Sequence, residues 1–230
     1  MNQVITGKKK ISEFVLEVFN SLLTVLKSKY FYFGLLSLGA GAALNFASQT
    51  YLHESVNEGK TLPMLSDLIL DNLPVIDVSL LYDLFCLVIF ATVAIYIIHR
   101  QEYRRIPYIL LLCGIFFIIR GIFIVLTPFG NPPEFNGSDP LFNGFSKFEL
   151  GVYPSGHVGN SFLLLLLVAD KGYRKIMSAW LAVIVISLFL AHGHYSIDML
   201  SGFLFAYAIK AYGDKHFTIF ILPNPKPSIT

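Results

Sequence analysis

Residues 106 to 126 read IPYILLLCGIFFIIRGIFIVL, a run of 21 residues in which Arg120 is the only charged side chain. A helix of about 20 apolar residues crosses the ~30 Å hydrocarbon core of a bilayer. The whole chain shares this character, since 55% of its 230 residues are hydrophobic, 14% are charged and the mean hydropathy is +0.64. These values exclude a soluble globular domain and predict an all-α, polytopic membrane protein.

Five further apolar stretches predict additional membrane helices, which gives six transmembrane helices in all. The stretches at residues 155–169 and 176–191 are short and need little tilt, or a few interfacial residues, to span. Glycines in the first stretch are expected to let helices pack closely: Gly34, Gly39 and Gly41. The five stretches cover residues 31–48, 78–98, 155–169, 176–191 and 196–211.

The segment before the first stretch has a different pattern. Residues 11–26 repeat apolar side chains at helical spacing between clusters of lysine, which predicts an amphipathic helix on the membrane surface. We therefore expect residues 1–30 to form a cytoplasmic segment, 31–212 a six-helix catalytic membrane domain and 213–230 a cytoplasmic tail.

The positive charges orient the six predicted helices. With the N-terminus in the cytoplasm, 14 of the 17 Lys and Arg residues are cytoplasmic, whereas only Lys60 and Lys147 face the other side and Arg120 lies within a span. Because cytoplasmic loops carry the excess of Lys and Arg, both termini are expected to be cytoplasmic.

Two short motifs then fall on the extracytoplasmic face. The first is Pro154-Ser155-Gly156-His157, and the second is His194-Tyr195-Ser196-Ile197-Asp198. Ionisable residues in a membrane domain are costly and indicate function. The spacing of His194 and Asp198 lets the carboxylate lie one helical turn away and orient the imidazole.

This set of side chains favours phosphoryl transfer. One histidine, made more basic by its carboxylate, attacks phosphorus, while the second protonates the departing oxygen. Arg120 lies at the depth needed to bind the phosphate oxygens. Two imidazoles that act on opposite sides of one phosphorus are expected to face each other across roughly 5–8 Å.

Other interpretations of the same residues remain open at this point. His192 and His194 could join His157 as three imidazole ligands of a metal, although Asp198 is better placed to orient His194. Arg120 could form a purely structural ion pair with Asp83. We predict neither a metal nor another cofactor.

The motifs resemble those of the type-2 phosphatidic acid phosphatase superfamily and, within it, the sphingomyelin synthase family. The superfamily's P-S-G-H box matches residues 154–157, and its S-R-x5-H-x3-D box matches Ser187, His194 and Asp198, with Leu188 in place of the Arg. Its early Lys-x6-Arg-Pro box is absent, which disfavours a plain lipid phosphatase.

Three further elements are similar to sphingomyelin synthases. The H-Y-x-x-D string matches residues 194–198, an Arg-x6-Thr-Pro element matches residues 120–128, and a Leu-Pro string matches residues 73–77. Val152-Tyr153-Pro154 replaces the family's Cys-Gly-Asp. The similarity extends over residues 73–212.

The resemblance implies an integral membrane enzyme that moves phosphocholine or phosphoethanolamine from a glycerophospholipid to ceramide or diacylglycerol. His194 would be the nucleophile, Asp198 its orienting partner and His157 the general acid and base. A lipid phosphate hydrolase and a non-catalytic lipid-binding protein are the alternatives. The resemblance also implies phosphate-binding residues (Arg120, Ser155, Gly156) and substrate contacts (Tyr153, Tyr195, Asp77, Asp83).

Overall fold

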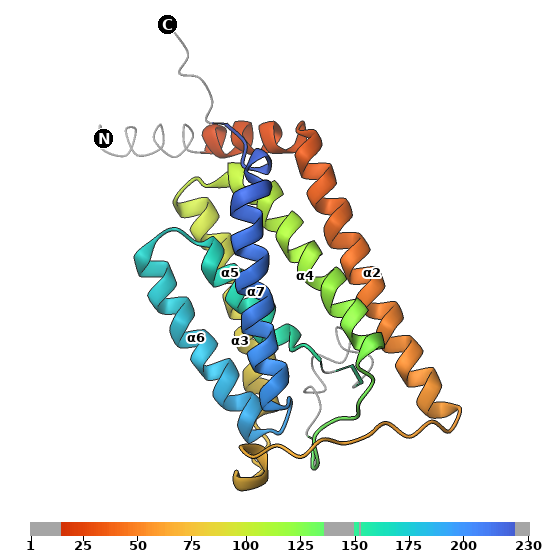
Figure 1. The fold of residues 1–230 in the computed structure, drawn as a ribbon. Coiled ribbons are helices and arrows are strands. Elements are labelled where there is room, and N and C mark those ends of the chain that lie inside the picture. The colour runs from red at the N-terminus through yellow and green to blue at the C-terminus, as the bar shows by residue number, and fades with distance from the viewer. Residues whose placement is uncertain (1–14, 136–149, 152, 224–230) are drawn as a thin grey trace, which may run out of the picture.

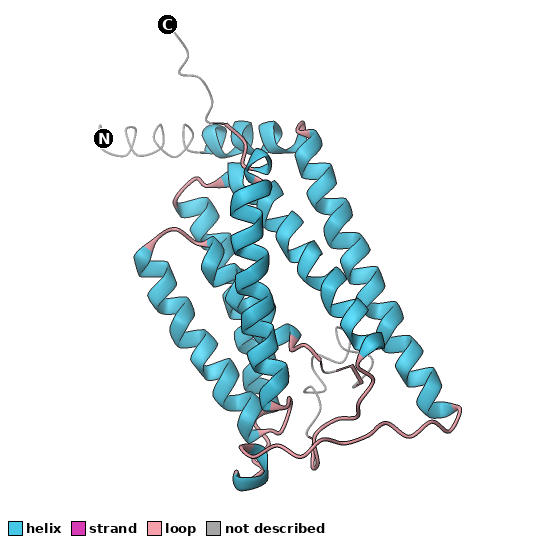
Figure 2. Ribbon diagram, viewed as in Figure 1, coloured by secondary structure: helices cyan, strands magenta, loops and turns pink. Residues whose placement is uncertain are grey.

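The computed structural model describes residues 15–135, 150–151 and 153–223, and these residues form helices and loops without a strand (Figure 2). A first helix covers Val15–Leu26. Three 3-10 turns lie at Leu70–Asn72, Tyr103–Arg105 and Thr218–Phe220. The long helices are α2 (Lys29–Asn57), α3 (Ser79–His99), α4 (Ile106–Leu126), α5 (Gly156–Leu167), α6 (Lys171–Leu190) and α7 (Ser196–His216).

Helices therefore occur at all six predicted places, and four of them are long and apolar enough to cross a membrane. These four are α2, α3, α4 with its preceding turn, and α6, and they are the helices of a membrane protein. The first prediction was too short, since α2 continues nine residues beyond Ser48 to Asn57. Helix α7 is as long as α3 but is less apolar, because its last turns carry Lys210, Asp214 and Lys215.

Helix α5 differs most from its prediction. The sequence predicts a span over residues 155–169, but α5 has 12 residues and reaches only about 18 Å at 1.5 Å per residue. Asp170 caps the next helix by accepting hydrogen bonds from the backbone N–H groups of Gly172 and Tyr173, so the chain reverses there. The start of α5 therefore lies within the bundle, short of the ends of α3, α4 and α7 (Figure 1).

Helices α2 and α4 pack side by side along their length (Figure 1). Glycines make this approach possible: a Cβ on Gly41 would lie 2.5 Å from the Gly114 carbonyl oxygen, and one on Gly114 would lie 2.3 Å from the carbonyl carbon of Ser37. Gly34 is equally close to α4, at 2.6 Å from the Pro107 carbonyl oxygen. Gly39 has no neighbour within 4 Å, so its predicted packing role was wrong.

Helices α5 and α7 form the centre of the bundle, with the pair α3 and α6 on one side and α4 on the other. Gly159 of α5 and Gly202 of α7 meet here, and a Cβ on Gly202 would lie 3.0 Å from the Ser155 carbonyl oxygen. The backbone N–H of Ser155 also donates to the Asp198 carbonyl at 3.0 Å. These contacts fix the start of α5 against the start of α7.

The two ends of the bundle are unlike each other. At one end, the helix Val15–Leu26 lies across the bundle (Figure 1), and Val25, Tyr103 and Leu222 form a small apolar cluster. The exposed side chains of Val15, Leu16 and Phe19 agree with the predicted surface helix, whose first residues, 11–14, lie outside the described part of the chain. The loops that follow α2 and α4 lie at the opposite end, nearest to the two histidine motifs.

Candidate active site

The first motif forms the N-terminus of α5. Ser155 is the N-cap residue, and its Oγ accepts a hydrogen bond from the backbone N–H of Val158 at 3.3 Å. Gly156 leaves room for Arg120, because a Cβ there would lie 3.1 Å from the Arg120 Nε. His157 therefore projects from the first turn of a helix whose N-terminal dipole favours a nearby anion.

The second motif forms the N-terminus of α7. The His194 Nδ1–H donates to Asp198 Oδ2 at 3.3 Å, and the same oxygen accepts from the backbone N–H of Tyr195 at 3.0 Å. The Asp198 side chain is fully buried and that of His194 is 5% exposed. This arrangement places the proton of neutral His194 on Nδ1 and leaves a lone pair on Nε2, as a nucleophile requires.

His194 lies in the turn between α6 and α7, and its surroundings keep it neutral. Burial lowers the pKa of His194 below the ordinary histidine value, and the charges of His157 and Arg120 act in the same direction. The Asp198 carboxylate raises the pKa of His194 but does not reverse the net shift. The ring is thus held in its nucleophilic form near pH 7.

The two histidines face each other. His157 Nδ1 lies 3.5 Å from His194 Nε2, and the ring centroids are 5.7 Å apart. The predicted gap of roughly 5–8 Å is met by the centroids but not by the facing nitrogens, because the rings are in direct contact. A phosphoryl group that needs ~3 Å on each side can enter only if the His157 ring turns away from His194.

The far nitrogen of His157 contacts a carboxylate that the sequence did not assign to it. His157 Nε2 lies 3.1 Å from Oδ1 of Asp83, a buried residue of α3. Four side chains therefore form one continuous chain, Asp83–His157–His194–Asp198. Because both outer nitrogens donate to carboxylates, the facing nitrogens form a hydrogen bond only when one additional proton is shared between the rings.

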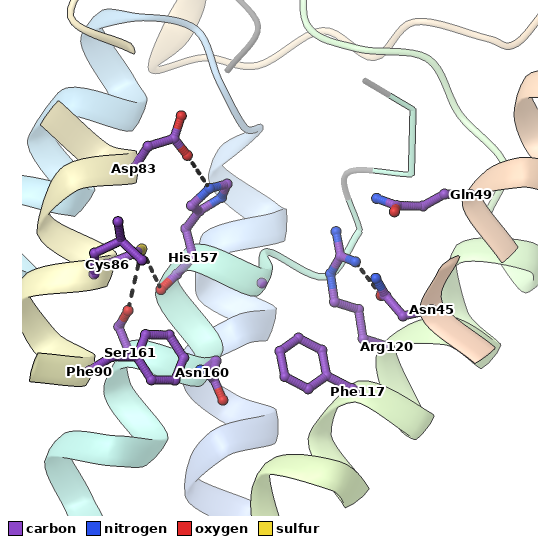
Figure 3. A pocket seen from close by; sticks show the side chains of 12 residues that line it. Asn45, Gln49, Asp83, Cys86, Phe90, Phe117, Arg120, His157, Asn160 and Ser161 are labelled. Atoms are coloured by element: carbon purple, nitrogen blue, oxygen red, sulfur yellow. Dashed lines mark hydrogen bonds and ion pairs between the residues drawn. The ribbon is translucent and has the colours of Figure 1, made fainter. Parts of the chain in front are cut away.

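A pocket of about 320 Å³ opens beside this chain (Figure 3). Its lining comes from α2, α3, α4 and α5 and combines polar side chains with the apolar side chains of Leu87, Phe90 and Phe117. His157 lines the pocket with a side chain that is 29% exposed, whereas His194 does not line it. His157 thus stands between the pocket and the nucleophilic nitrogen of His194.

Arg120 of α4 lies in the same pocket and also organises the loop before α5. Its Nε donates to the Pro154 carbonyl at 3.0 Å and its Nη2 to the Gly151 carbonyl at 2.9 Å. Its Nη1 donates to Asn45 Oδ1 of α2. Each terminal nitrogen carries a second N–H, so the guanidinium retains donors for a phosphate. The alternative ion pair is not the arrangement observed, since Asp83 faces His157.

Three predicted substrate contacts have structural partners instead. Asp77 Oδ1 accepts from the backbone N–H and the hydroxyl of Ser79 at the start of α3. The Tyr153 hydroxyl accepts from Ser201, and the Tyr195 hydroxyl donates to the Asn131 carbonyl. None of the three lines the pocket beside His157.

The alternative interpretation, a metal site of three histidines, does not fit the arrangement. His192 Nδ1 donates to the Pro133 carbonyl at 3.1 Å, away from His157. Within residues 15–135, 150–151 and 153–223, no three metal-binding side chains gather around one point.

One residue that positions the site was missed by the sequence reasoning. Asp67, in the loop after α2, accepts hydrogen bonds from the backbone N–H and the hydroxyl of Ser196, the first residue of the helix that carries Asp198. Burial raises the pKa of Asp67, but the hydrogen bonds from Ser196, Leu70 and Ile69 outweigh it and lower the pKa overall. In the sequence, Asp67 could have been recognised only as an aspartate that precedes a short turn, whose Oδ1 accepts from the backbone N–H groups of Ile69 and Leu70.

Neither a protein-family model nor a curated protein sequence matches the chain. The interpretation of the site therefore rests on its own geometry and on the two motifs.

Proposed function

We propose that this chain is a multi-pass membrane enzyme that transfers a phospho-head-group from a glycerophospholipid to a lipid hydroxyl, through a phosphohistidine on His194. The single observation that carries the proposal is the chain of side chains Asp83–His157–His194–Asp198 beside a pocket that also contains Arg120. It supplies a fixed nucleophile, a proton donor and a cation for the phosphate within one site.

The first half-reaction uses both histidines. His194 Nε2 attacks phosphorus and forms the N–P bond, while the P–O bond to the diacylglycerol breaks. The proton shared between the two rings moves with His157 Nδ1 and is donated to the departing oxygen. Asp83 orients His157 for this role, as Asp198 orients His194.

The second half-reaction reverses the proton transfer. His157 now accepts the proton of the acceptor hydroxyl, the new oxygen attacks phosphorus, and the N–P bond to His194 breaks. Arg120 and the N-terminus of α5 stabilise the negative charge on the non-bridging oxygens in both steps. The second N–H groups of Arg120 supply these hydrogen bonds without releasing the loop that Arg120 holds.

The shape of the pocket supports a lipid substrate. Asn45, Gln49 and Arg120 lie together at a polar end of the pocket, and Phe90 and Phe117 lie on either side of Asn160 (Figure 3). Leu87 also lines the pocket. A head group at the polar end would leave the acyl chains along the apolar residues, between α3 on one side and α2 with α4 on the other. Such a pocket binds an amphipathic molecule in one orientation.

The proposed topology follows from the distribution of charge. We propose six traverses with both termini in the cytoplasm and the pocket on the extracytoplasmic side. Support comes from Arg100, Arg104 and Arg105, which lie between α3 and α4 at the end of the bundle opposite to the pocket, next to the helix Val15–Leu26. An excess of basic residues is typical of the cytoplasmic face.

Purified protein in detergent tests the proposal. It would be incubated with phosphatidylcholine or phosphatidylethanolamine and a fluorescent ceramide or diacylglycerol, and the products resolved by mass. We expect transfer of the head group to an acceptor, its loss in His194→Ala, and its retention in the control His216→Ala, at the other end of α7. Stoichiometric free phospho-base without an acceptor would indicate a hydrolase, and no turnover of any phospholipid would contradict the proposal.

A further inference from the structure

Asn160 is a polar pocket residue that the proposed reaction does not use. It lies on α5 one turn beyond His157, between Phe90 and Phe117 (Figure 3), and it is only 4% exposed. Its Oδ1 is buried and has no hydrogen-bond partner. Most buried side-chain polar atoms have a hydrogen-bond partner, so we expect a bound molecule to donate a hydrogen bond to this oxygen.

We infer that Asn160 is a specificity-determining residue that accepts a hydrogen bond from an N–H or O–H group of the acceptor lipid, close to its reacting hydroxyl. The inference rests on the proposed function, because it assumes that the pocket binds a lipid acceptor. Asn160 would favour an acceptor lipid that carries a hydrogen-bond donor next to its reacting hydroxyl. A ceramide carries a secondary amide N–H and a second hydroxyl, whereas a diacylglycerol presents only ester oxygens, which cannot donate.

The spacing on α5 fits this role. Asn160 is three positions after His157, which is about 4.5 Å of helix rise along α5 away from its N-terminus. In a ceramide, the amide nitrogen is bonded to the carbon next to the one that carries the reacting hydroxyl, so it lies within roughly 4 Å of that oxygen at ordinary bond lengths. A hydroxyl at His157 therefore brings the amide to the level of Asn160.

The side chain has the freedom that the contact requires. The last torsion of asparagine is broad and roughly two-fold, so turning the amide over exchanges Oδ1 with Nδ2 and directs Oδ1 toward the pocket. Leu87, Phe90 and Phe117 line the same pocket and offer no hydrogen-bond donor to Oδ1. A site that is built to bind a donor disfavours a molecule that lacks one, because its own acceptor is then left unpaired.

The test compares acceptors within one protein preparation. Wild type and Asn160→Leu, a change of similar shape without an acceptor atom, would be assayed with ceramide, N-methyl ceramide and diacylglycerol. The ratio of kcat/KM for ceramide to that for diacylglycerol does not depend on the amount of folded enzyme. We expect this ratio to fall roughly 10- to 100-fold in Asn160→Leu, with turnover of diacylglycerol retained.

N-methyl ceramide is the matched substrate control, because it lacks the amide donor. Wild type is expected to discriminate against it, and Asn160→Leu to lose most of that discrimination. An unchanged ratio in Asn160→Leu, or a wild type that prefers diacylglycerol, would overturn the inference.

A binding measurement separates this inference from the proposed reaction. Fluorescent short-chain ceramide and diacylglycerol would be titrated into both proteins without a donor lipid. Stronger ceramide binding that depends on Asn160 would support the inference even if no transfer occurs, and equal ceramide binding by both proteins would overturn it even if transfer does occur.

Discussion

The two histidines of the site differ in exposure although each has a carboxylate partner. His194 is 5% exposed and pairs with the fully buried Asp198, whereas His157 is 29% exposed and faces the pocket. Burial makes the His194 ring neutral and fixed. The exposure of His157 gives it access to substrate oxygens, which suits an acid and base that must also move aside.

Donors with different leaving groups separate the two roles. His194→Ala removes the atom that bonds to phosphorus, so all turnover is expected to be lost with every donor. His157→Ala removes the proton donor and is expected to slow turnover of natural phospholipids by ~10²–10⁴. An aryl phosphodiester, whose leaving group needs no proton, is expected to restore much of the rate to His157→Ala only. Equal rescue of both variants would mean that the nucleophile is misassigned.

The pH dependence of kcat/KM reports the state of His194. Because the pKa of His194 is lowered, the acidic limb of the profile is expected below the ordinary histidine value of about 6.5. Asp198→Asn removes the charge that raises this pKa, so the acidic limb is expected to move to still lower pH as the maximal rate falls. A limb that moves to higher pH in Asp198→Asn would contradict the assigned pair.

The contact between α5 and α7 holds the two motifs in register. Gly202→Val places side-chain carbons against the Ser155 carbonyl oxygen and the Gly159 backbone, which lie 3.0 and 3.1 Å from a Cβ at that position. Overpacking of this kind is expected to lower the free energy of unfolding by about 1–3 kcal/mol. The variant should therefore unfold at a lower temperature in detergent and lose most of its transfer activity. The measurement is thermal unfolding together with kcat.

Gly39→Val is the control for that experiment. Gly39 has no neighbour within 4 Å, so a side chain there meets no other helix. Its unfolding temperature and activity are expected to change little. Equal effects of the two variants would show that the α5–α7 contact is not what holds the site together.

The start of α5 lies inside the bundle, which makes the two ends of the whole molecule different. The site lies within the bundle near the end where the loops after α2 and α4 meet, and the basic residues of the α3–α4 turn lie at the other end (Figure 1). A phosphate bound there would be held between helices rather than on a flat surface. This placement explains why Arg120 and Asp83, both buried, carry charge inside apolar helices.

Single cysteines test the proposed orientation. In a variant that lacks Cys86 and Cys113, Leu68→Cys lies on the loop after α2, beside the start of α7, at a position that is 84% exposed. An impermeant thiol reagent is expected to label it in intact cells. Lys171→Cys, at the start of α6, is expected to react only after permeabilisation. The reverse pattern would place the active site in the cytoplasm.

Local spacing made part of this structure predictable. The run 106–126 matches α4 residue for residue, and the four-residue spacing of His194 and Asp198 matches their hydrogen bond. The pairing of Asp83 with His157 joins residues 74 positions apart, and that of Asp67 with Ser196 joins residues 129 apart. Such contacts depend on how the helices pack, which no local pattern specifies.

The difference between local patterns and helix packing also explains the predictions from which the structure differs. Tyr153 directly precedes the first motif and Tyr195 lies within the second, so both were predicted to contact substrate, but packing turns their hydroxyls toward Ser201 and Asn131. The length of α5 was overestimated because apolar residues continue past its end, and the cap formed by Asp170 reverses the chain there.

Direct capture of the covalent intermediate is the most decisive measurement. Purified protein would be mixed with an activated phosphodiester donor without acceptor, quenched at alkaline pH, where phosphohistidine survives, and digested for mass spectrometry. We predict a phospho-head-group on His194, lost in acid, absent from His194→Ala and accumulated in His157→Ala, which cannot activate the next hydroxyl. An adduct on His157, or rapid turnover with no adduct on His194, would contradict the mechanism.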